Sequence, residues 1–169
     1  MKKRLSIKAR QEAMAKIGVF VGTVYGGAEE VAEAAVEKLV ATGHEAQLYP
    51  EPQFDDFIQY SEDVVLVVTS TTGEGELPDN LLSLYLVLNE QFPQMSELRY
   101  GVIAMGDLSY GEERFCGGGR QVDELLQQLQ ARALVPILQV DASVNFDALE
   151  VAIPWLDDFL GQLEPKHKV

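Results

Sequence analysis

The chain has 169 residues, of which 47% are hydrophobic and 24% charged, and this is the size and composition of one globular domain with a full core. Its formal net charge of −14 argues against nucleic-acid binding, because contacts to phosphates need cations. No apolar run reaches the roughly 18 residues of a membrane-spanning helix, and the single cysteine, Cys116, excludes an internal disulfide and favours the cytoplasm.

The charge is distributed unevenly along the chain. Residues 1–16 hold six of the thirteen basic residues, whereas residues 17–169 hold 7 basic and 26 acidic residues, a net charge of −19. This acidity keeps the protein in solution or attracts a basic partner protein, and the two interpretations are compatible. The basic start lacks the apolar region of a secretory signal and fits a transit peptide only weakly. We predict a mobile extension over residues 1–15, which a second possible start at Met14 would explain equally well, then a domain over residues 16–163 and a tail over residues 164–169.

Apolar periodicity predicts strands and helices that alternate along the domain. In chain order these are a strand at 16–22, a helix at 27–42, an edge strand at 45–50, a buried strand at 63–70, a helix from 79 to about 92, a buried strand at 99–107, an amphipathic helix at 119–133, a strand at 134–141 and a helix at 145–163. This pattern predicts an α/β fold: a doubly wound, five-stranded parallel sheet in the order 2-1-3-4-5, with helices on both faces. Ligands of such sheets bind beyond the carboxyl ends of the strands, so the loops there are the candidate site.

The first of these loops, GTVYGGAEE (residues 22–30), joins a buried strand to a helix, as phosphate-binding loops do. It contains no lysine or arginine, and its glycine spacing matches neither G-x-G-x-x-G nor the P-loop. Two interpretations remain open. The hydroxyls of Thr23 and Tyr25 and the N–H groups of residues 26–29 bind a terminal phosphate, or the segment is an ordinary glycine turn in which Thr23 caps the helix.

The second and third loops carry different chemistry. TSTTGEGELPDN (69–80) offers hydroxyls, flexible glycines and acids, which suit a neutral, flat group bound by peptide N–H and C=O. In GDLSYGEERFCGGGRQ (106–121), Tyr110 is a stacking wall or a half-buried surface tyrosine, Phe115 is expected in the core, and Cys116 is expected to be a small buried side chain rather than a reactive thiol. None of the three loops contains a histidine, so a serine or cysteine hydrolase or a histidine metal site has no support.

The segments STTGEGELPDN and MGDLSYGEERFCGGG resemble those of flavodoxins, especially short-chain flavodoxins of the MioC and YqcA type. They are also similar to the FMN-binding, flavodoxin-like domain of sulfite and cytochrome P-450 reductases. The resemblance covers roughly residues 16–163, and the unbroken fifth strand matches the short-chain class. The first loop departs from the family's usual T-x-T-G-N-T, since Tyr25, Gly27 and Ala28 replace hydroxyl or amide residues while Gly26 is kept.

The resemblance implies FMN as the cofactor and assigns it residues from all three loops. Around the phosphate it places Thr23, Val24, Tyr25, Gly26, Gly27 and Ala28. Around the isoalloxazine ring and ribityl chain it places Ser70, Thr71, Thr72, Gly73, Glu74 and Gly75. The third loop supplies Gly106, Asp107 and the outer stacking wall Tyr110, while Phe115, Cys116 and Gly117 close the site.

The implied function is that of an electron-transfer flavoprotein rather than an enzyme with its own substrate. Acidic residues crowd the ring-side loops and disfavour the anion that full reduction creates, so we expect a low-potential one-electron carrier: Glu74, Glu76, Asp107, Glu112 and Glu113. The implied donor is a basic-faced, NADPH-dependent flavodoxin/ferredoxin reductase, and the implied acceptor is an iron–sulfur or radical enzyme. We expect a cytoplasmic monomer without a metal and without nucleic-acid or membrane partners.

Three other functions compete with this one. A phospho-receiver domain needs acids after the first and third strands and a lysine after the fifth, where this chain has Gly22-Thr23, Thr69 and Asp141-Ala142. An FMN-dependent quinone or azo reductase needs a substrate pocket over the ring, usually built at a dimer interface, and the second and third loops are short. A cofactor-free interaction module becomes possible through the altered first loop.

Overall fold

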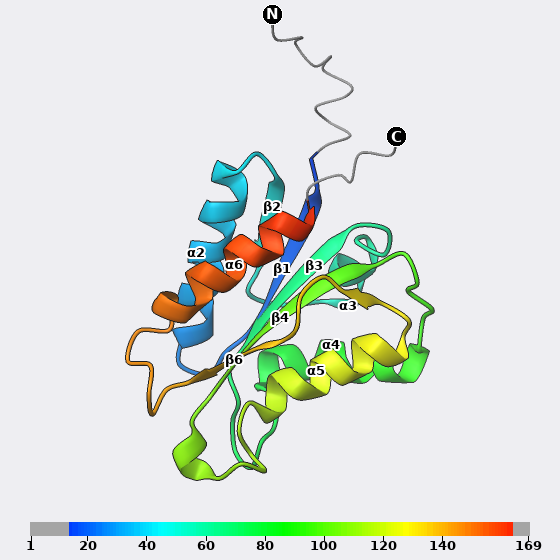
Figure 1. Cartoon of the computed structure of the whole chain (residues 1–169). Coiled ribbons are helices and arrows are strands. Elements are labelled where there is room, and N and C mark those ends of the chain that lie inside the picture. Colours follow the sequence, from blue (N-terminus) through cyan, green and yellow to red (C-terminus); the bar gives the residue numbers. More distant parts are fainter. Residues whose placement is uncertain (1–13, 164–169) are drawn as a thin grey trace, which may run out of the picture.

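Six strands make one sheet. The helices between the parallel strands return the chain to the end of the sheet where each strand begins (Figure 1). The computed structural model describes residues 14–163, so the predicted extension (1–15) lies almost wholly, and the predicted tail (164–169) entirely, outside the described residues. The strands are β1 (Lys16–Gly22), β2 (Glu45–Tyr49), β3 (Val64–Thr69), β4 (Arg99–Gly106), β5 (Arg132–Ala133) and β6 (Leu138–Asp141). The helices are α2 (Gly27–Ala41), α3 (Phe54–Ile58), α4 (Asp79–Gln91), α5 (Gly117–Gln128) and α6 (Leu149–Leu163), with a 3-10 turn, η1 (Leu108–Tyr110).

The strand order is β2-β1-β3-β4-β5, and β6 also pairs with β4. Every pairing between these strands is parallel, which confirms the predicted doubly wound α/β fold with helices on both faces. The register aligns the strand ends, because Gly22 pairs with Thr69, Thr69 with Ala104, and Gly106 with Asp141. The loops that follow β1, β3, β4 and β6 therefore leave the sheet at one edge, in the lower half of Figure 1.

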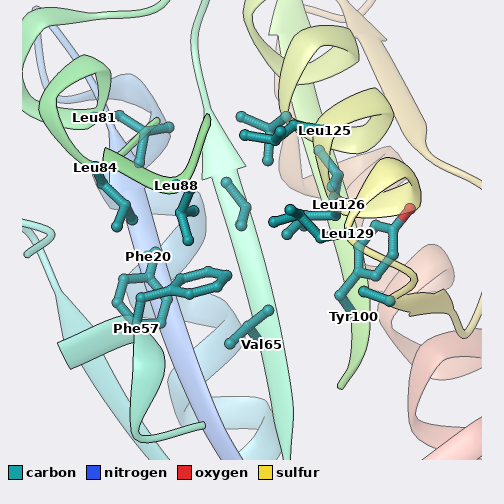
Figure 2. Close-up of a cluster of buried hydrophobic side chains, with 14 of the residues drawn as sticks. Phe20, Phe57, Val65, Leu81, Leu84, Leu88, Tyr100, Leu125, Leu126 and Leu129 are labelled. Carbon is teal, nitrogen blue, oxygen red and sulfur yellow. The ribbon is translucent and has the colours of Figure 1, made fainter. Parts of the chain in front are cut away.

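The two faces of the sheet bury separate apolar clusters. Alternate residues of β3 point to opposite faces, so Val65 and Val67 belong to one cluster while Val64, Leu66 and Val68 belong to the other. Helices α3, α4 and α5 cover the first face, where Figure 2 shows leucines from α4 and α5 closing over the strands beside the rings of β1 and α3. Helices α2 and α6 cover the second face. Burial on both sides explains why β3 is a continuous apolar run.

The outer strand beside β4 is not the single, unbroken strand predicted over residues 134–141. It consists of β5 and β6, separated by residues 134–137. Between the β4–β5 pairing and the β4–β6 pairing, β4 has two residues (101–102) and the opposite segment has four (134–137). The hydrogen bonds between the two segments therefore cannot continue in register. Pro136 has no N–H to donate, and its carbonyl accepts a hydrogen bond of 2.9 Å from Trp155 Nε1 on α6.

Two predicted helix boundaries were wrong by several residues. Helix α5 ends at Gln128 instead of residue 133, because Gln130 has a positive φ of 74° and the N–H of Arg132 bonds to the carbonyl of Leu98 as the edge strand begins. Helix α6 begins at Leu149 instead of residue 145, where Oδ1 of Asp147 accepts a hydrogen bond from the N–H of Leu149. The short helix α3 was not predicted.

Helix α5 packs unusually close to β4 because its first turn consists of glycines. A Cβ atom added to Gly119 would lie 2.2 Å from the Cβ of Ala104 on β4, which is far inside van der Waals contact. The close approach brings the first turn of α5 against the loop that follows β3. The triple glycine therefore serves packing at the loop end of the sheet.

We predict that Gly119→Ala lowers the free energy of unfolding by about 1–3 kcal/mol, because the added methyl group overlaps Ala104 and must displace the helix. Urea denaturation measures the change. Gly161→Ala is the matched control, since Gly161 is an exposed helical glycine with nothing within 4 Å of an added Cβ atom. It should raise the stability by roughly 0.5–1 kcal/mol. Equal stability changes in the two variants would contradict the packing argument.

Candidate functional site

The loop after β1 is held in place by a side chain from α4. Asn80 accepts a hydrogen bond from the N–H of Thr23 through Oδ1 (2.9 Å) and donates through Nδ2 to the carbonyls of Val21 (2.9 Å) and Pro50 (3.1 Å). One amide thus connects the end of β1, the loop that follows it and the end of the β2 segment. This role of Asn80 was not predicted from the sequence, because the residues that its side chain bonds lie 30 to 59 positions away in the chain.

The same loop presents backbone donors at the start of α2. Thr23 Oγ1 accepts a hydrogen bond of 2.8 Å from the N–H of Gly26, and Gly26, with a φ of 91°, occupies the N-cap position that one interpretation had given to Thr23. Cβ atoms added to Gly26 or Gly27 would meet nothing within 4 Å, so the space before the helix is open. An α-helix leaves its first N–H groups without intrahelical acceptors, and these donors together with the helix dipole suit an anion.

The other predicted residues of this loop differ in their exposure. Val24 is half exposed and Tyr25 is 98% exposed, whereas Ala28 is fully buried in the core beneath α2. Ala28 therefore offers an incoming ligand only its backbone.

The loops after β3 and β4 are locked together by backbone contacts. Gly117 lies so close to Gly75 that an added Cβ would be 2.4 Å from the Gly75 carbonyl oxygen, and Gly118 approaches the Ser70 carbonyl in the same way. Thr71 Oγ1 accepts a hydrogen bond of 3.2 Å from the N–H of Gly118, and Gln121 Nε2 donates to the Gly75 carbonyl at 2.8 Å. The loop after β3 is thus fixed by the first turn of α5.

A cleft of about 400 Å³ opens between these two loops. Its lining comes from the loop after β3, from the end of β4 and η1, and from the loop after β6: Ser70, Thr71, Thr72, Gly73, Met105, Gly106, Asp107, Tyr110, Arg114 and Ala142. Seven of these ten residues were predicted to contact a flat ligand; Met105, Arg114 and Ala142 were not. Tyr110 is 71% exposed, so it is a surface tyrosine that also lines the cleft.

The remaining predicted residues of these loops support the cleft without lining it. Gly75 has a φ of 99°, and its Cα faces the backbone of Arg114. Phe115 packs partly buried against the core, as predicted. Cys116 is fully buried, its thiol donates to the carbonyl of Ala104 at 3.3 Å, and burial raises its thiol pKa to about 11. This confirms the expectation of a small buried side chain instead of a reactive thiol.

Asp141, at the end of β6, joins the loop after β4 to the loop after β6. Its Oδ1 accepts hydrogen bonds from the N–H of Leu108 (3.0 Å), the N–H of Ser143 (3.0 Å) and the hydroxyl of Ser143 (2.7 Å). The hydrogen bonds from Leu108 and Ser143 hold the carboxyl pKa below its usual value. The sequence had shown Asp141 only as the last residue of a strand, so this role could not be predicted from it.

The charges around the cleft are mostly negative, with one cation at its wall. The Arg114 guanidinium lies 3.4 Å from a carboxylate oxygen of Glu74, and both side chains are substantially exposed. Arg120 donates to the carbonyls of Glu112 and Glu113 and so holds the loop that carries these two acids. Within residues 14–163, no group of three or more His, Cys, Asp or Glu residues could hold a metal ion.

The two parts of this edge therefore suit one ligand with two different ends. The first loop offers hydroxyls and N–H groups to an anion, and the cleft beside it has the size of a small-molecule site with one aromatic residue, Tyr110, in its lining. The sequence profile of the flavodoxin family matches residues 19–155. The chain belongs to the flavodoxin family. Members of this family are electron carriers that bind FMN, and the two-part site agrees with a phosphate end and a ring end.

Named relatives lie close to this chain in sequence. Flavodoxin YqcA of Escherichia coli is 44% identical over 146 residues, which cover 86% of this chain and 97% of YqcA. A cysteine-to-serine variant of a flavodoxin from Pseudomonas aeruginosa superposes with a TM-score of 0.81 at 45% identity, covering 88% of this chain and 98% of that one. The flavoprotein alpha-component of sulfite reductase from Vibrio cholerae is 35% identical over 162 residues, or 94% of this chain but 25% of that protein.

These matches confirm the predicted resemblance to short-chain flavodoxins and to the sulfite reductase domain. A flavodoxin from Fusobacterium nucleatum bound to flavin mononucleotide shares the fold, with a TM-score of 0.71 at 14% identity. No helix in the described part of the chain combines the length and apolar character needed to cross a membrane.

We predict that Asn80→Asp destabilises the protein by about 1–3 kcal/mol and weakens FMN binding. A carboxylate still accepts the Thr23 N–H but cannot donate to the carbonyls of Val21 and Pro50, and it repels both. Urea denaturation and FMN titration measure the two effects. Asn89→Asp is the control, because Asn89 is an exposed residue near the far end of α4. Unchanged FMN affinity in the Asn80 variant would show that FMN binding does not depend on the way Asn80 holds the loop after β1.

Proposed function

We propose that this chain is a low-potential one-electron carrier that binds FMN between the loops after β1, β3 and β4. The observation that carries the proposal is the paired site: the N–H donors of the first turn of α2, with open space at Gly26 and Gly27, beside a cleft of about 400 Å³ lined by peptide groups and Tyr110. Bound FMN supplies the redox chemistry, and the protein orients it and tunes its potential.

The phosphate end would be held without a cation. The Thr23 hydroxyl and the N–H groups of residues 27–29 would supply hydrogen bonds, and Asn80 fixes the turn that precedes them. Tyr25, Gly27 and Ala28 provide fewer side-chain donors than the usual loop of the family, so most of the binding energy here comes from the backbone. The ring end would lie in the cleft, with Ser70–Gly73 on one side and Asp107 and Tyr110 on the other.

The charges around the cleft determine whether the protein raises or lowers the reduction potential of bound FMN. Glu74, Glu76, Asp107, Glu112 and Glu113 lie on the two ring-side loops and disfavour additional negative charge in the cleft. The Arg114 guanidinium opposes them, because it lies at the cleft wall and is paired with Glu74. The net effect of these groups is a low reduction potential for the second one-electron step of bound FMN.

The proposed donor is an NADPH-dependent flavodoxin/ferredoxin reductase with a basic face, and the proposed acceptor is an iron–sulfur or radical enzyme in the cytoplasm. The net charge of −19 over residues 17–169 supports a basic partner, since complementary charge steers such encounters. Electron-transfer complexes of this kind are small and short-lived, and salt weakens them.

FMN binding is tested by titrating the purified protein with FMN and with riboflavin, which lacks the phosphate. We expect FMN to bind more tightly and to survive desalting. Thr23→Val removes the hydroxyl at the phosphate loop and should weaken FMN about tenfold while riboflavin binding stays unchanged. Thr42→Val, at the opposite end of α2, is the control and should change neither affinity. Equal affinities of the wild type for FMN and riboflavin would eliminate the phosphate site.

Redox tuning is tested by potentiometric titration of the FMN-loaded protein. We expect two separate one-electron steps, with the second at low potential. Arg114→Gln should lower the second potential and Glu74→Gln should raise it, each by roughly 20–60 mV, since 1.4 kcal/mol corresponds to about 60 mV for one electron. Glu90→Gln, an exposed acid near the far end of α4, is the control. A single two-electron step would contradict the carrier function.

A further inference from the structure

Exposed apolar side chains gather at the same edge of the sheet as the cofactor site. Ten large hydrophobic side chains are exposed within residues 14–163, and six of them lie on loops after β1, β4 and β6: Val24, Tyr25, Leu108, Tyr110, Val144 and Phe146. A concentration of apolar side chains around one site, surrounded by polar residues, marks an interaction surface.

Apart from Tyr25, the two most exposed large hydrophobic side chains both lie on the loop after β6. Phe146 is fully exposed and Val144 is 76% exposed. No predicted FMN contact lies in this loop, yet Ala142 from the same loop lines the cleft, so the loop that carries the two side chains borders the proposed cofactor site. Exposure of a whole phenylalanine ring is unfavourable in water, and neither the fold nor FMN binding accounts for it.

The loop that carries these side chains is held in one shape by Asp141. The Asp141 carbonyl accepts hydrogen bonds from the N–H groups of Val144 (3.1 Å) and Asn145 (2.8 Å), while its carboxylate holds Ser143 and Leu108. The N–H of Ala142 bonds to the Gly106 carbonyl at 2.9 Å, which ties the loop to the end of β4. A pre-formed loop loses little conformational entropy when a partner covers it, so its apolar groups contribute more of their burial energy to binding.

The charge around this loop indicates the chemistry of the partner. Residues 141–163 contain five acidic residues and no lysine, arginine or histidine. On the neighbouring loop, Asp107, Glu112 and Glu113 add to the same field. A second copy of this chain would bring two acidic rims together, and an anionic membrane would be repelled. A basic protein surface is the complementary occupant.

We propose that Val144 and Phe146 form an apolar anchor by which this chain docks onto a basic redox partner, with the two side chains entering an apolar pocket enclosed by lysines and arginines. This inference rests on the proposed carrier function and assigns to the loop after β6 a part in partner binding. The acids around the anchor steer the encounter and determine its salt dependence, whereas the anchor determines how slowly the complex dissociates. Because the anchor stands beside the cleft, docking there places the partner close to the cofactor site.

The test measures binding of the purified, full-length protein to a bacterial NADPH-dependent flavodoxin/ferredoxin reductase by isothermal titration calorimetry at several NaCl concentrations. Phe146→Ser and Val144→Ser should each weaken binding by about five- to twentyfold and leave the slope of log affinity against log salt unchanged. Glu113→Gln should reduce that slope. Leu86→Ser is the matched control, since Leu86 is a 55% exposed leucine on α4, and it should bind as the wild type does.

Thermal unfolding and the FMN absorbance of each preparation are recorded beside the binding curves. A wild type that binds the reductase through Phe146 but fails to retain FMN supports the docking anchor and contradicts the proposed carrier function. A wild type that retains FMN while Phe146→Ser binds the reductase as tightly overturns the anchor. The anchor is also overturned if sedimentation shows a wild-type dimer that Phe146→Ser dissociates, or if the wild type binds phosphatidylglycerol vesicles and Phe146→Ser does not.

Discussion

Parallel strand register is the constraint on which the rest of this structure depends. Because Gly22, Thr69 and Ala104 lie side by side across three strands, and Gly106 lies beside Asp141, the loops after β1, β3, β4 and β6 all leave the sheet along one edge. Every feature of the site follows from this alignment. The donors before α2, the cleft and the exposed loop after β6 all lie within a few residues of a strand end.

The features that sequence analysis recovered are those that local chemistry determines. The strands β1, β3 and β4 are continuous apolar runs because both of their faces are covered, and the glycines and hydroxyls of the loops stand directly after them. The fold and the order of the strands could therefore be predicted, whereas seven of the ten residues lining the cleft were named through the resemblance to flavodoxins. Glycine clusters identified the loops, although only the structure shows that Gly117 and Gly119 are small because other backbone or side-chain atoms lie against them.

The features that it missed depend on partners far away in the chain. Asn80 and Asp141 stand in sequence as a helix residue and a strand end, and nothing nearby reveals that they hold loops 57 and 33 residues distant. The edge strand was predicted as one piece because its apolar pattern is unbroken, while the interruption arises from a mismatch in length with β4 and from Pro136. Arg114 lies in a run of charged loop residues and gains its place at the cleft only through tertiary packing.

The burial of Cys116 affects how readily its thiol is oxidised in air. Reduced flavoproteins pass electrons to dioxygen and generate peroxide, which attacks thiolates far faster than thiols. The only sulfhydryl group of this chain lies within one loop of the cofactor cleft, yet its high pKa of about 11 and its complete burial keep it protonated and out of reach. Burial therefore protects this thiol from the peroxide that a reduced flavin bound nearby would generate.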